Sequence, residues 1–345
     1  MTARGILALG VLTLVALTLA LILGRPDSSS EPVESQPLVP GLRDLINEVS
    51  AVDVLDADGA ALVSLRRDRD RWRVLEKAGY EADFALVHDL LRDLASGRRL
   101  EARTSNPDWY ERLGVSDPGQ GSSGIALRFP DSGLPGLLIG NLDNTESGRF
   151  VRLEGESQTW LSDRRLDLPA TTLGWLERAV MDIPASELRE VTLRHPDGDF
   201  VQLRAASDDG EDWVLMNVPE GREAVQMWQL RPIANGLANL NLEGVRAHQQ
   251  VPADAVRALY VTRDGLNFVA SLFQDEDGRW VHFTVSAEVA ATGDGDPEPA
   301  QEDTEALANA TAVDARLNPW QFRVSERKFE NMTRRLEELL TPEEA

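Results

Sequence analysis

The longest hydrophobic pattern in the chain is an uncharged, mostly apolar run from Gly5 to Gly24. A helix of this length spans about 30 Å, which matches the hydrocarbon thickness of a bilayer. The alternatives are a cleaved signal peptide and a buried core helix. The apolar region of a signal peptide is usually about 7 to 15 residues long and ends in small residues, whereas this run is longer and ends with Ile22 and Leu23 before Gly24. We therefore predict an uncleaved transmembrane helix over residues 5–24.

Three later segments share one pattern of apolar and polar positions, which indicates an internal repeat. In each segment, alternating apolar residues flank an Asp-Gly pair, and a strand that carries a tryptophan follows. The members are Gly59, Gly198 and Gly265, with Trp72, Trp213 and Trp280. Asp-Gly between alternating apolar residues is the strongest short hairpin signal. The pattern predicts three antiparallel three-stranded meanders with equivalent two-residue turns, positive φ at each glycine and each tryptophan in the core.

Helical periodicity appears between and after these segments. Residues 83–96 place apolar side chains, from Phe84 to Leu94, on one face, which predicts an amphipathic helix capped by Asp83. We also predict helices over 173–181, 223–240 and 325–340 and a strand over 322–324. Alternating segments between the first two repeats predict further strands at 125–129, 137–140, 150–153 and 159–161.

These elements define the expected organisation of the chain. The fold class is α+β: a single N-terminal transmembrane helix followed by repeated antiparallel β-meander plus helix units. The expected parts are a cytoplasmic tail 1–4, the anchor 5–24, a Pro/Ser-rich tether 25–41, a first α+β repeat region 42–183, the second and third meanders 184–287, an acidic insert 288–313, and a closing strand and helix 314–345. The insert has no apolar period, so we predict that it is disordered and dispensable for folding.

Charge and composition narrow the compartment and the partners. The net charge of −23 argues against nucleic acid and against a body that lies flat on anionic lipid. No cysteine is present, which excludes a lipobox, thiolate metal sites and thiol catalysis. Lys77 and Lys328 are the only lysines, and this preference for arginine is typical of a GC-rich bacterial genome. With Arg4 before the span and nearly the whole chain after it, we predict a bacterial inner-membrane protein with a cytoplasmic N-terminus and a periplasmic body.

Motif searching yields no catalytic, cofactor-binding or metal-binding residue. The four histidines, His88, His195, His248 and His282, show no metal-binding spacing. The glycine-rich segment 119–124 lacks the Lys-Ser/Thr of a phosphate-binding loop. The acidic runs 208–212 and 275–278 lack calcium-loop spacing and fall where the repeat needs turns. We therefore predict a protein that is not an enzyme and needs no cofactor.

Several short motifs together resemble a known family. They are Arg71-Trp72-Arg73-Val74, Ala82-Asp83, Leu113-Gly114-Val115, Leu138-Ile139-Gly140, Arg149-Phe150-Val151-Arg152, Thr159-Trp160-Leu161, Asp182-Ile183 and Val191-x-Leu193. This set resembles the membrane-anchored domain of unknown function 4340, over roughly residues 51–240. The segment Arg112-Leu113-Gly114-Val115 departs from the usual Tyr-Gly-Leu but keeps the glycine turn. The resemblance implies an accessory role beside ABC transporters of the gliding-motility type and assigns no catalytic residues.

Two binding functions and one enzymatic function follow as hypotheses. The leading one is a membrane-anchored extracytoplasmic scaffold or accessory subunit that binds ABC-transporter permease or auxiliary subunits. The alternative is an extracytoplasmic module that binds a glycan or peptide, and a carboxylate-based hydrolase comes third. A buried carboxylate pair in a deep cleft would favour the enzyme, whereas an exposed hydrophobic patch would favour the scaffold.

Overall fold

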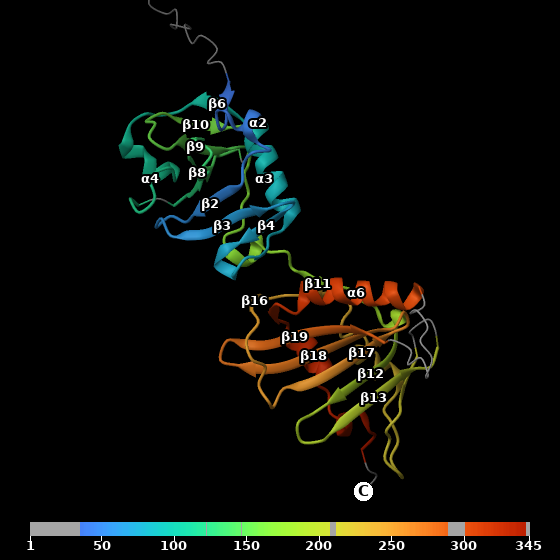
Figure 1. The fold of residues 1–345 in the computed structure, drawn as a ribbon. Helices are drawn as coiled ribbons and strands as arrows, with labels where there is room; N and C mark the ends of the chain where they lie inside the picture. The colour runs from blue at the N-terminus through green and yellow to red at the C-terminus, as the bar shows by residue number, and fades with distance from the viewer. Residues whose placement is uncertain (1–34, 122, 146, 208–211, 289–300, 343–345) are drawn as a thin grey trace, which may run out of the picture. The chain divides into compact units, whose positions relative to one another are not determined.

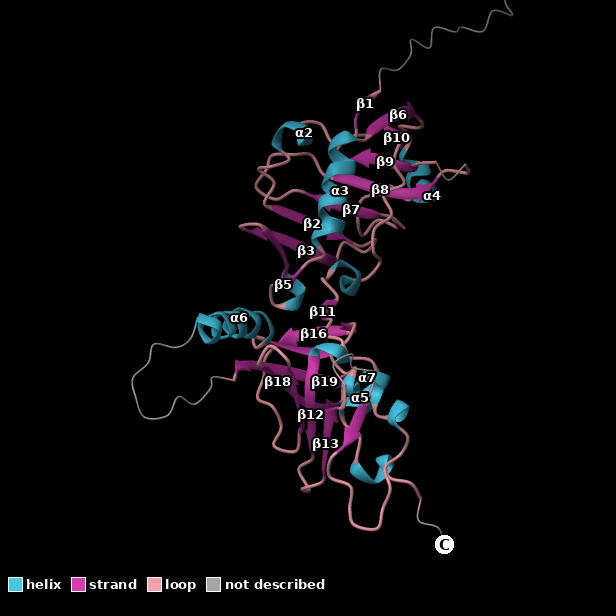
Figure 2. Cartoon of the chain, turned by 90° about the vertical axis from the view of Figure 1, so that its right-hand side faces the viewer, coloured by secondary structure: helices cyan, strands magenta, loops and turns pink. Residues whose placement is uncertain are grey.

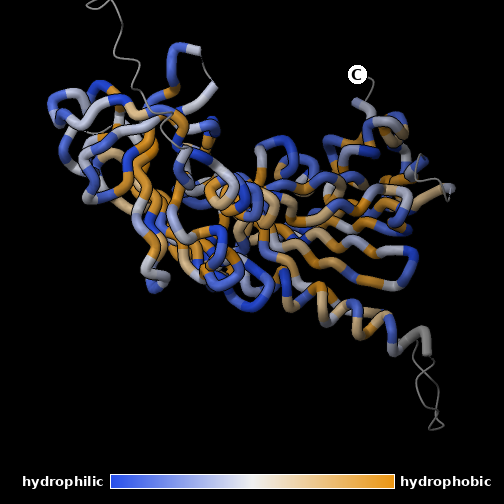
Figure 3. The backbone as a smooth tube through the Cα atoms, turned by 90° about the horizontal axis from the view of Figure 1, so that it is seen from above, coloured by the Kyte–Doolittle hydropathy of each residue, from blue (hydrophilic) through white to orange (hydrophobic). Residues whose placement is uncertain are grey.

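A computed structural model describes residues 35–342, except 122, 146, 208–211 and 289–300. The chain divides into two compact units (Figure 1). Unit 1 contains the described residues up to Ala61 and Asp89–Leu168, and unit 2 contains Leu62–His88 and the chain from Pro169 onward. In both units, apolar residues concentrate along the strands and hydrophilic residues in the connections (Figure 3). We describe each unit by itself.

The predicted tail and anchor, residues 1–24, lie outside the described residues. Between residues 35 and 342, as far as the structure describes them, no helix is long and apolar enough to cross a membrane. The predicted tether extends too far, because strand β1 (Gln36–Pro37) already pairs with β6 (Arg98–Ala102), and Leu38 and Val39 are buried. Burial of the apolar side chains of Leu38 and Val39 stabilises this segment against unit 1.

Unit 1 is built on an antiparallel sheet. Its strands hydrogen-bond in the order β1-β6-β10-β9-β8-β7-β2. The bounds not yet given are β2 Ala51–Leu55, β7 Ile125–Arg128, β8 Leu137–Leu142, β9 Arg149–Leu153 and β10 Thr159–Ser162, with the short helices α2 Leu42–Leu45, η2 Pro107–Trp109 and α4 Tyr110–Leu113. The predicted strands from residue 125 to 161 are confirmed. Strand β6 went unpredicted because its sequence is mostly charged.

Helix α3 (Phe84–Ser96) crosses the boundary between the units and confirms the helix predicted over 83–96. The carboxylate of Asp83 accepts the N–H of Leu86 at 3.0 Å and caps the first turn. The apolar stripe buries Val87, Leu90, Leu91 and Leu94, whereas Phe84 is 58% exposed and lies outside the core. Figure 2 shows the later part of α3 running across the strands of unit 1.

Unit 2 contains a larger antiparallel sheet in the order β14-β13-β12-β17-β18-β19-β20-β16. Its bounds are β12 Leu188–Arg194, β13 Phe200–Ala205, β14 Trp213–Leu215, β16 Gly244–Ala247, β17 Val256–Thr262, β18 Leu266–Asp275, β19 Gly278–Ala287 and β20 Trp320–Arg323. The other strands are β3 Ala61–Asp68, β4 Arg71–Val74, β5 Tyr80–Glu81, β11 Ala179–Met181 and β15 Leu240–Asn241. The helices are η1 Leu75–Lys77, η3 Thr172–Trp175, η4 Ala185–Glu187, η5 Met227–Gln229, α5 Arg231–Ala234, α6 Gln301–Leu317, α7 Glu326–Met332 and η6 Leu336–Leu339.

The turns of the three predicted repeats share one geometry. Gly59, Gly198 and Gly265 have φ of 86°, 93° and 85°, as predicted. Each glycine N–H donates to the carbonyl three residues earlier, at 3.1, 3.1 and 3.3 Å. The closing pairs, such as Asp56 N–H with the Ala60 carbonyl at 2.9 Å, enclose three residues rather than the predicted two. The Asp-Gly pair therefore ends a three-residue hairpin loop with glycine in the left-handed position.

The tryptophans are buried, but Trp280 is not equivalent to Trp213. Trp213 pairs with Ala205 and lies on the same sheet face as the buried Leu203. In the third meander, Val281 pairs with Leu272 on that inner face, so Trp280, opposite Phe273, points to the other face. A shift of one residue reverses the face of a strand residue. The predicted coincidence of the three tryptophans is therefore wrong for Trp280.

Several predicted helices are shorter than expected or are not helices. Residues 173–181 form a 3₁₀ turn and strand β11. Residues 223–239 contain only η5 and α5, and Pro232 in the first turn of α5 prevents one continuous helix from running through this position. The closing helix begins at Ser325, whose hydroxyl accepts the Lys328 N–H, but α7 ends at Met332. Of the acidic insert, residues 289–300 lie outside the described residues.

The remainder of the insert is ordered, which corrects the prediction of disorder over 288–313. Residues 301–317 form α6, which packs against β19 and buries Ala310 and Leu317. The carboxylate of Asp314 accepts the N–H of Val285 on β19 at 2.7 Å. Alanine, the best helix former, is frequent in this segment, and that propensity outweighs its weak apolar period.

Candidate functional site

The second face of the unit 2 sheet carries two rows of side chains that cross four strands. The first row is Gly244, Arg323, Trp280 and Phe273, and the second is Arg246, Gln321, His282 and Ser271. Residues that lie directly opposite one another on paired strands share a face. The shift that turns Trp280 away from the inner core therefore brings it beside three polar side chains.

Arg246 organises the centre of these rows. Its Nε donates to Gln321 Oε1 and its Nη2 to Asp275 Oδ2, both at 2.8 Å. Its guanidinium carbon lies 4.0 Å from the centre of the Trp280 ring, which is a close cation–π contact. The Trp280 indole N–H donates to Asp275 Oδ1 at 2.8 Å, so one carboxylate fixes both partners of the stack.

The electrostatics of this cluster keep Asp275 ionised. Burial alone would raise the pKa of Asp275, but hydrogen bonds from Arg246, Trp280 and the Asp277 N–H outweigh it and lower the pKa. A carboxyl group with a lowered pKa is a poor general acid at neutral pH. Asp275 therefore serves as a fixed anion that orients Arg246.

A cavity of about 480 Å³ opens beside this cluster within unit 2. Arg246, Trp280, Arg323, Lys77 and Glu243 are among its lining residues. Arg323 Nη2 donates to the Glu243 carbonyl at 2.7 Å. Gly278 makes room for this side chain, because a Cβ there would come within 2.8 Å of Arg323 Cδ. The cavity combines cationic and anionic groups with an aromatic edge, which suits a polar ligand with both donors and acceptors.

Two of the four histidines meet in the structure. The rings of His248 and His282 stack with centres 4.0 Å apart, and His282 Nδ1 lies 3.0 Å from the Trp320 carbonyl. Burial, and then the neighbouring His282, lower the pKa of His248, so this ring stays neutral at pH 7. Sequence spacing does not reveal this pair, because His282 lies in β19 and His248 directly follows β16, and these two strands flank β20. His195 instead contacts the Arg334 carbonyl, and His88 stacks on Phe84.

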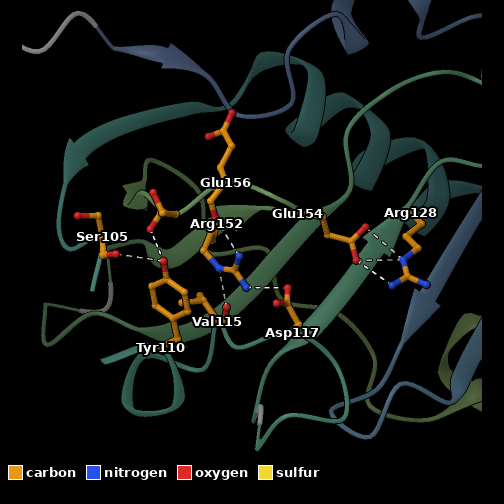
Figure 4. A network of polar contacts seen from close by, with 9 residues as sticks. Ser105, Tyr110, Val115, Asp117, Arg128, Arg152, Glu154 and Glu156 are labelled. Carbon is orange, nitrogen blue, oxygen red and sulfur yellow. Dashed lines mark hydrogen bonds and ion pairs between the residues drawn. The ribbon is translucent and has the colours of Figure 1, made fainter. Parts of the chain in front are cut away.

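Unit 1 contains a second polar network, centred on the buried Arg152 of β9 (Figure 4). Arg152 donates to the Val115 and Glu156 carbonyls at 2.9 Å and to Asp117 Oδ1 at 2.8 Å. Its guanidinium also lies 4.5 Å from the centre of the Tyr110 ring. All three nitrogens of Arg152 are engaged by the protein. This network therefore holds loops to the sheet and is not a binding site.

Neighbouring polar residues have the same structural role. The Tyr110 hydroxyl donates to the Ser157 carbonyl, and Arg128 makes a two-point contact with Glu154, with nitrogen–oxygen distances of 3.0 and 2.9 Å (Figure 4).

In the glycine-rich segment 119–124, Gly119 and Gly121 adopt positive φ, and residue 122 is outside the described residues.

Among the residues that the structure describes, no three His, Cys, Asp or Glu side chains gather closely enough to hold a metal ion. Of the two acidic runs, Asp275–Gly278 closes the turn between β18 and β19, as predicted. Residues 208–211 lie outside the described part, so the prediction for the other run stays a prediction.

Comparison with known proteins gives one match. The family model "Domain of unknown function (DUF4340)" matches residues 72–259, which is more than half of the chain. No curated protein and no solved structure is significantly similar to it. The matched range contains Arg152 and Asp117 of unit 1 and Arg246 of unit 2, whereas Asp275, Trp280 and Arg323 lie beyond it.

Proposed function

Since the chain belongs to the DUF4340 family of domains of unknown function, we propose that it is a non-enzymatic scaffold. In this proposal it is an accessory subunit of an envelope complex that contains an ABC transporter. Residues 5–24 anchor it in the bacterial inner membrane, and the body lies in the periplasm. Its partners are permease or auxiliary subunits of the transporter.

The observation that carries this proposal is an exposed apolar patch at the edge of the unit 2 sheet. We call Phe200, Val214 and Met216 the edge patch; they are 39%, 44% and 45% exposed. Val214 pairs with Arg204, and the Met216 N–H donates to the Gln202 carbonyl, so all three patch residues share the outer face of β13 and β14. Exposed apolar side chains gathered on one face are typical of protein-binding surfaces.

The carboxyl groups support binding over hydrolysis. The pKa values of Asp143, Asp167, Asp197 and Asp275 are all shifted downward by hydrogen bonds that outweigh burial. A hydrolase with two carboxyl groups needs one whose pKa is raised, so that it can donate a proton. These four aspartates therefore favour a role in holding the fold.

Site-specific photocrosslinking in cells tests the proposal. A photoreactive phenylalanine analogue replaces Met216, and a matched variant carries it at Arg257, an exposed position on the same sheet. We expect position 216, but not 257, to crosslink to a transporter permease or auxiliary subunit, and Phe200→Glu to reduce the yield. The proposal fails if position 216 gives no product beyond that of 257, or if its products are unrelated to a transporter.

The second candidate, a glycan- or peptide-binding module, is favoured by the cavity beside Arg246. In that case Arg246→Ala would weaken ligand binding because the guanidinium lines the cavity. The same variant would leave crosslinking from position 216 unchanged. The two functions therefore separate in one pair of experiments.

A further inference from the structure

A second cavity, of about 620 Å³, opens at one end of unit 1. Three elements meet there: the segment after β1, the short helix α2 and the C-terminal end of α3 (Figure 2). Its lining combines two kinds of surface. Arg43, Arg92 and Arg98 contribute guanidinium groups, whereas Val39 and Ile46 contribute apolar wall. We call this cavity the arginine pocket.

The charges of the arginine pocket are unbalanced. Arg92 pairs with Asp89 at 3.0 Å. Within the described part of the chain, the exposed side chains of Arg43 and Arg98 have no ion pair, and Asp44 is the only acidic residue of the lining. Acidic residues greatly outnumber basic ones in this protein, and arginines such as Arg99, Arg128 and Arg149 do pair with carboxylates. Two arginines without an ion pair in the lining of one cavity therefore leave a local site for an anion.

The shape of the lining narrows the kind of anion. A free inorganic anion needs donors around it, but one side of this pocket is apolar through Val39, Ile46 and Ala95. A molecule that carries a phosphate group next to a hydrocarbon part would satisfy both sides. Guanidinium groups bind phosphate oxygens in a two-point geometry. A phospholipid has this combination.

The path of the chain brings the pocket to such a molecule. Pro37, in strand β1, is part of the pocket wall. Only residues 25–34 separate the predicted transmembrane span from the first described residue, and even a fully extended chain of that length reaches at most about 35 Å. The pocket wall therefore follows the predicted span after a connection of at most about 35 Å.

From these observations we infer that the arginine pocket binds the phosphate headgroup of an anionic phospholipid in the membrane that holds the anchor. The inference rests on the proposed function only for that anchor. Arg43 and Arg98 contact the phosphate, and the apolar wall takes the glycerol and the first methylene groups. The net charge of −23 repels the body from anionic lipid as a whole. Screening limits that repulsion to about 8 Å at physiological salt, so the two arginines dominate inside the pocket.

Calorimetric titration of the full-length protein in a neutral detergent tests the inference. The probe is dihexanoyl-phosphatidylglycerol, and the comparison ligands are dihexanoyl-phosphatidylcholine and inorganic phosphate. We expect only phosphatidylglycerol to bind measurably. The double variant Arg43→Gln/Arg98→Gln should lose about 25-fold in affinity, because each of the two arginines contributes on the order of a fivefold gain at an anionic membrane.

A matched control carries the same loss of charge elsewhere. Arg69→Gln/Arg257→Gln removes two exposed arginines of unit 2 and should bind phosphatidylglycerol like the unchanged protein. Equal losses in both double variants would overturn the inference, as would equal binding of phosphatidylcholine. Binding of inorganic phosphate with the same affinity would identify a site for free phosphate and also overturn it.

Two further measurements separate the possible failures. Thermal unfolding followed by circular dichroism shows whether Arg43→Gln/Arg98→Gln remains folded, and Arg43→Lys/Arg98→Lys tests charge without the guanidinium fork. Carbonate extraction of the same cells reports on the anchor. A retained anchor with no phosphatidylglycerol binding refutes the arginine pocket alone, whereas an extracted protein refutes the proposed membrane location.

Discussion

Arg152 of unit 1 and Arg246 of unit 2 have opposite roles. In unit 1 the Arg152 side chain is 4% exposed, and its three nitrogens all bond to the protein. In unit 2 the Arg246 side chain is 21% exposed and stacks on Trp280 at the wall of a cavity. Both lie beside an aspartate and an aromatic ring. The difference is depth: the buried arginine holds loops together, whereas the partly exposed one can present a face to a ligand.

Replacing Arg152 and Arg246 in turn should give the largest difference in the free energy of unfolding. Arg152→Leu should destabilise the protein by about 3 kcal/mol, because it removes three hydrogen bonds and leaves the buried Val115 carbonyl without a donor. The carboxylate of Asp117 is half exposed, so water can hydrate it when Arg152 is removed. Loss of this ion pair therefore adds little to the destabilisation. Arg246→Leu should cost about 1 kcal/mol. Urea unfolding of the two variants measures the difference, and equal costs would end the distinction between Arg152 and Arg246.

Local sequence patterns predicted the parts of each unit that local physics determines. The three Asp-Gly turns, the strands from residue 125 to 161 and helix α3 all follow from alternation, periodicity and capping within about fifteen residues. The prediction for Trp280 was wrong because the sheet face to which it points depends on its pairing with Phe273 across a hairpin. The sequence of one strand does not reveal a shift of one residue in that pairing.

The candidate sites depended on contacts that are distant in the sequence. Arg246, Asp275 and Gln321 lie on β16, at the end of β18 and on β20. No motif spacing connects them, and the family pattern assigned them no role. The acidic composition also concealed α6, since a count of charges does not reveal that Asp314 can bond to the edge of a strand. Composition does not indicate which acidic residues hold the fold.

The units also differ in how they protect the edge of a sheet. In unit 1 the two-residue strand β1 covers part of β6, whereas in unit 2 helix α6 covers the end of β19. Ala310→Asp should cost about 2 kcal/mol, because it buries a charge in that helix–strand contact. Ala308→Asp changes an exposed position of the same helix and should cost little. Equal unfolding midpoints for the two variants would mean that α6 does not support the sheet.

The shared turns give a smaller test. Gly59 in unit 1 and Gly198 in unit 2 both have positive φ, which disfavours any side chain. A Cβ at Gly59 would lie 3.3 Å from Pro118 Cβ, whereas a Cβ at Gly198 meets nothing within 4 Å. Gly198→Ala should therefore cost about 1 kcal/mol from backbone strain alone, and Gly59→Ala slightly more. Thermal unfolding of both variants measures the order, and a larger cost at Gly198 would contradict it.

The smallest expected effect is a difference between Asp143 and Asp197 in how salt changes the pKa of the carboxyl group. In unit 1, hydrogen bonds lower the pKa of Asp143 to about 2; the strongest comes from the Thr145 hydroxyl, and others come from the N–H groups of Gly148, Thr145 and Ser147. In unit 2, a hydrogen bond from Arg335, 2.8 Å away, is the main cause of the lowered pKa of Asp197. Neutral donors are insensitive to salt, whereas the attraction of an exposed ion pair is screened.

A carboxyl group whose pKa is lowered by folding stabilises the folded state at pH values above its ordinary pKa of about 3.9. This stability is lost as the pH falls through the pKa of the group in the folded protein. For Asp143 that window runs from about pH 4 to about pH 2. Carbon-detected NMR titration should show that 1 M salt raises the pKa of Asp197 toward its ordinary range but leaves that of Asp143 in place. Thr145→Val should raise the pKa of Asp143 and leave Asp197 unchanged. If salt moves both values equally, charge rather than the local loop holds Asp143, and the two units do not differ in this respect.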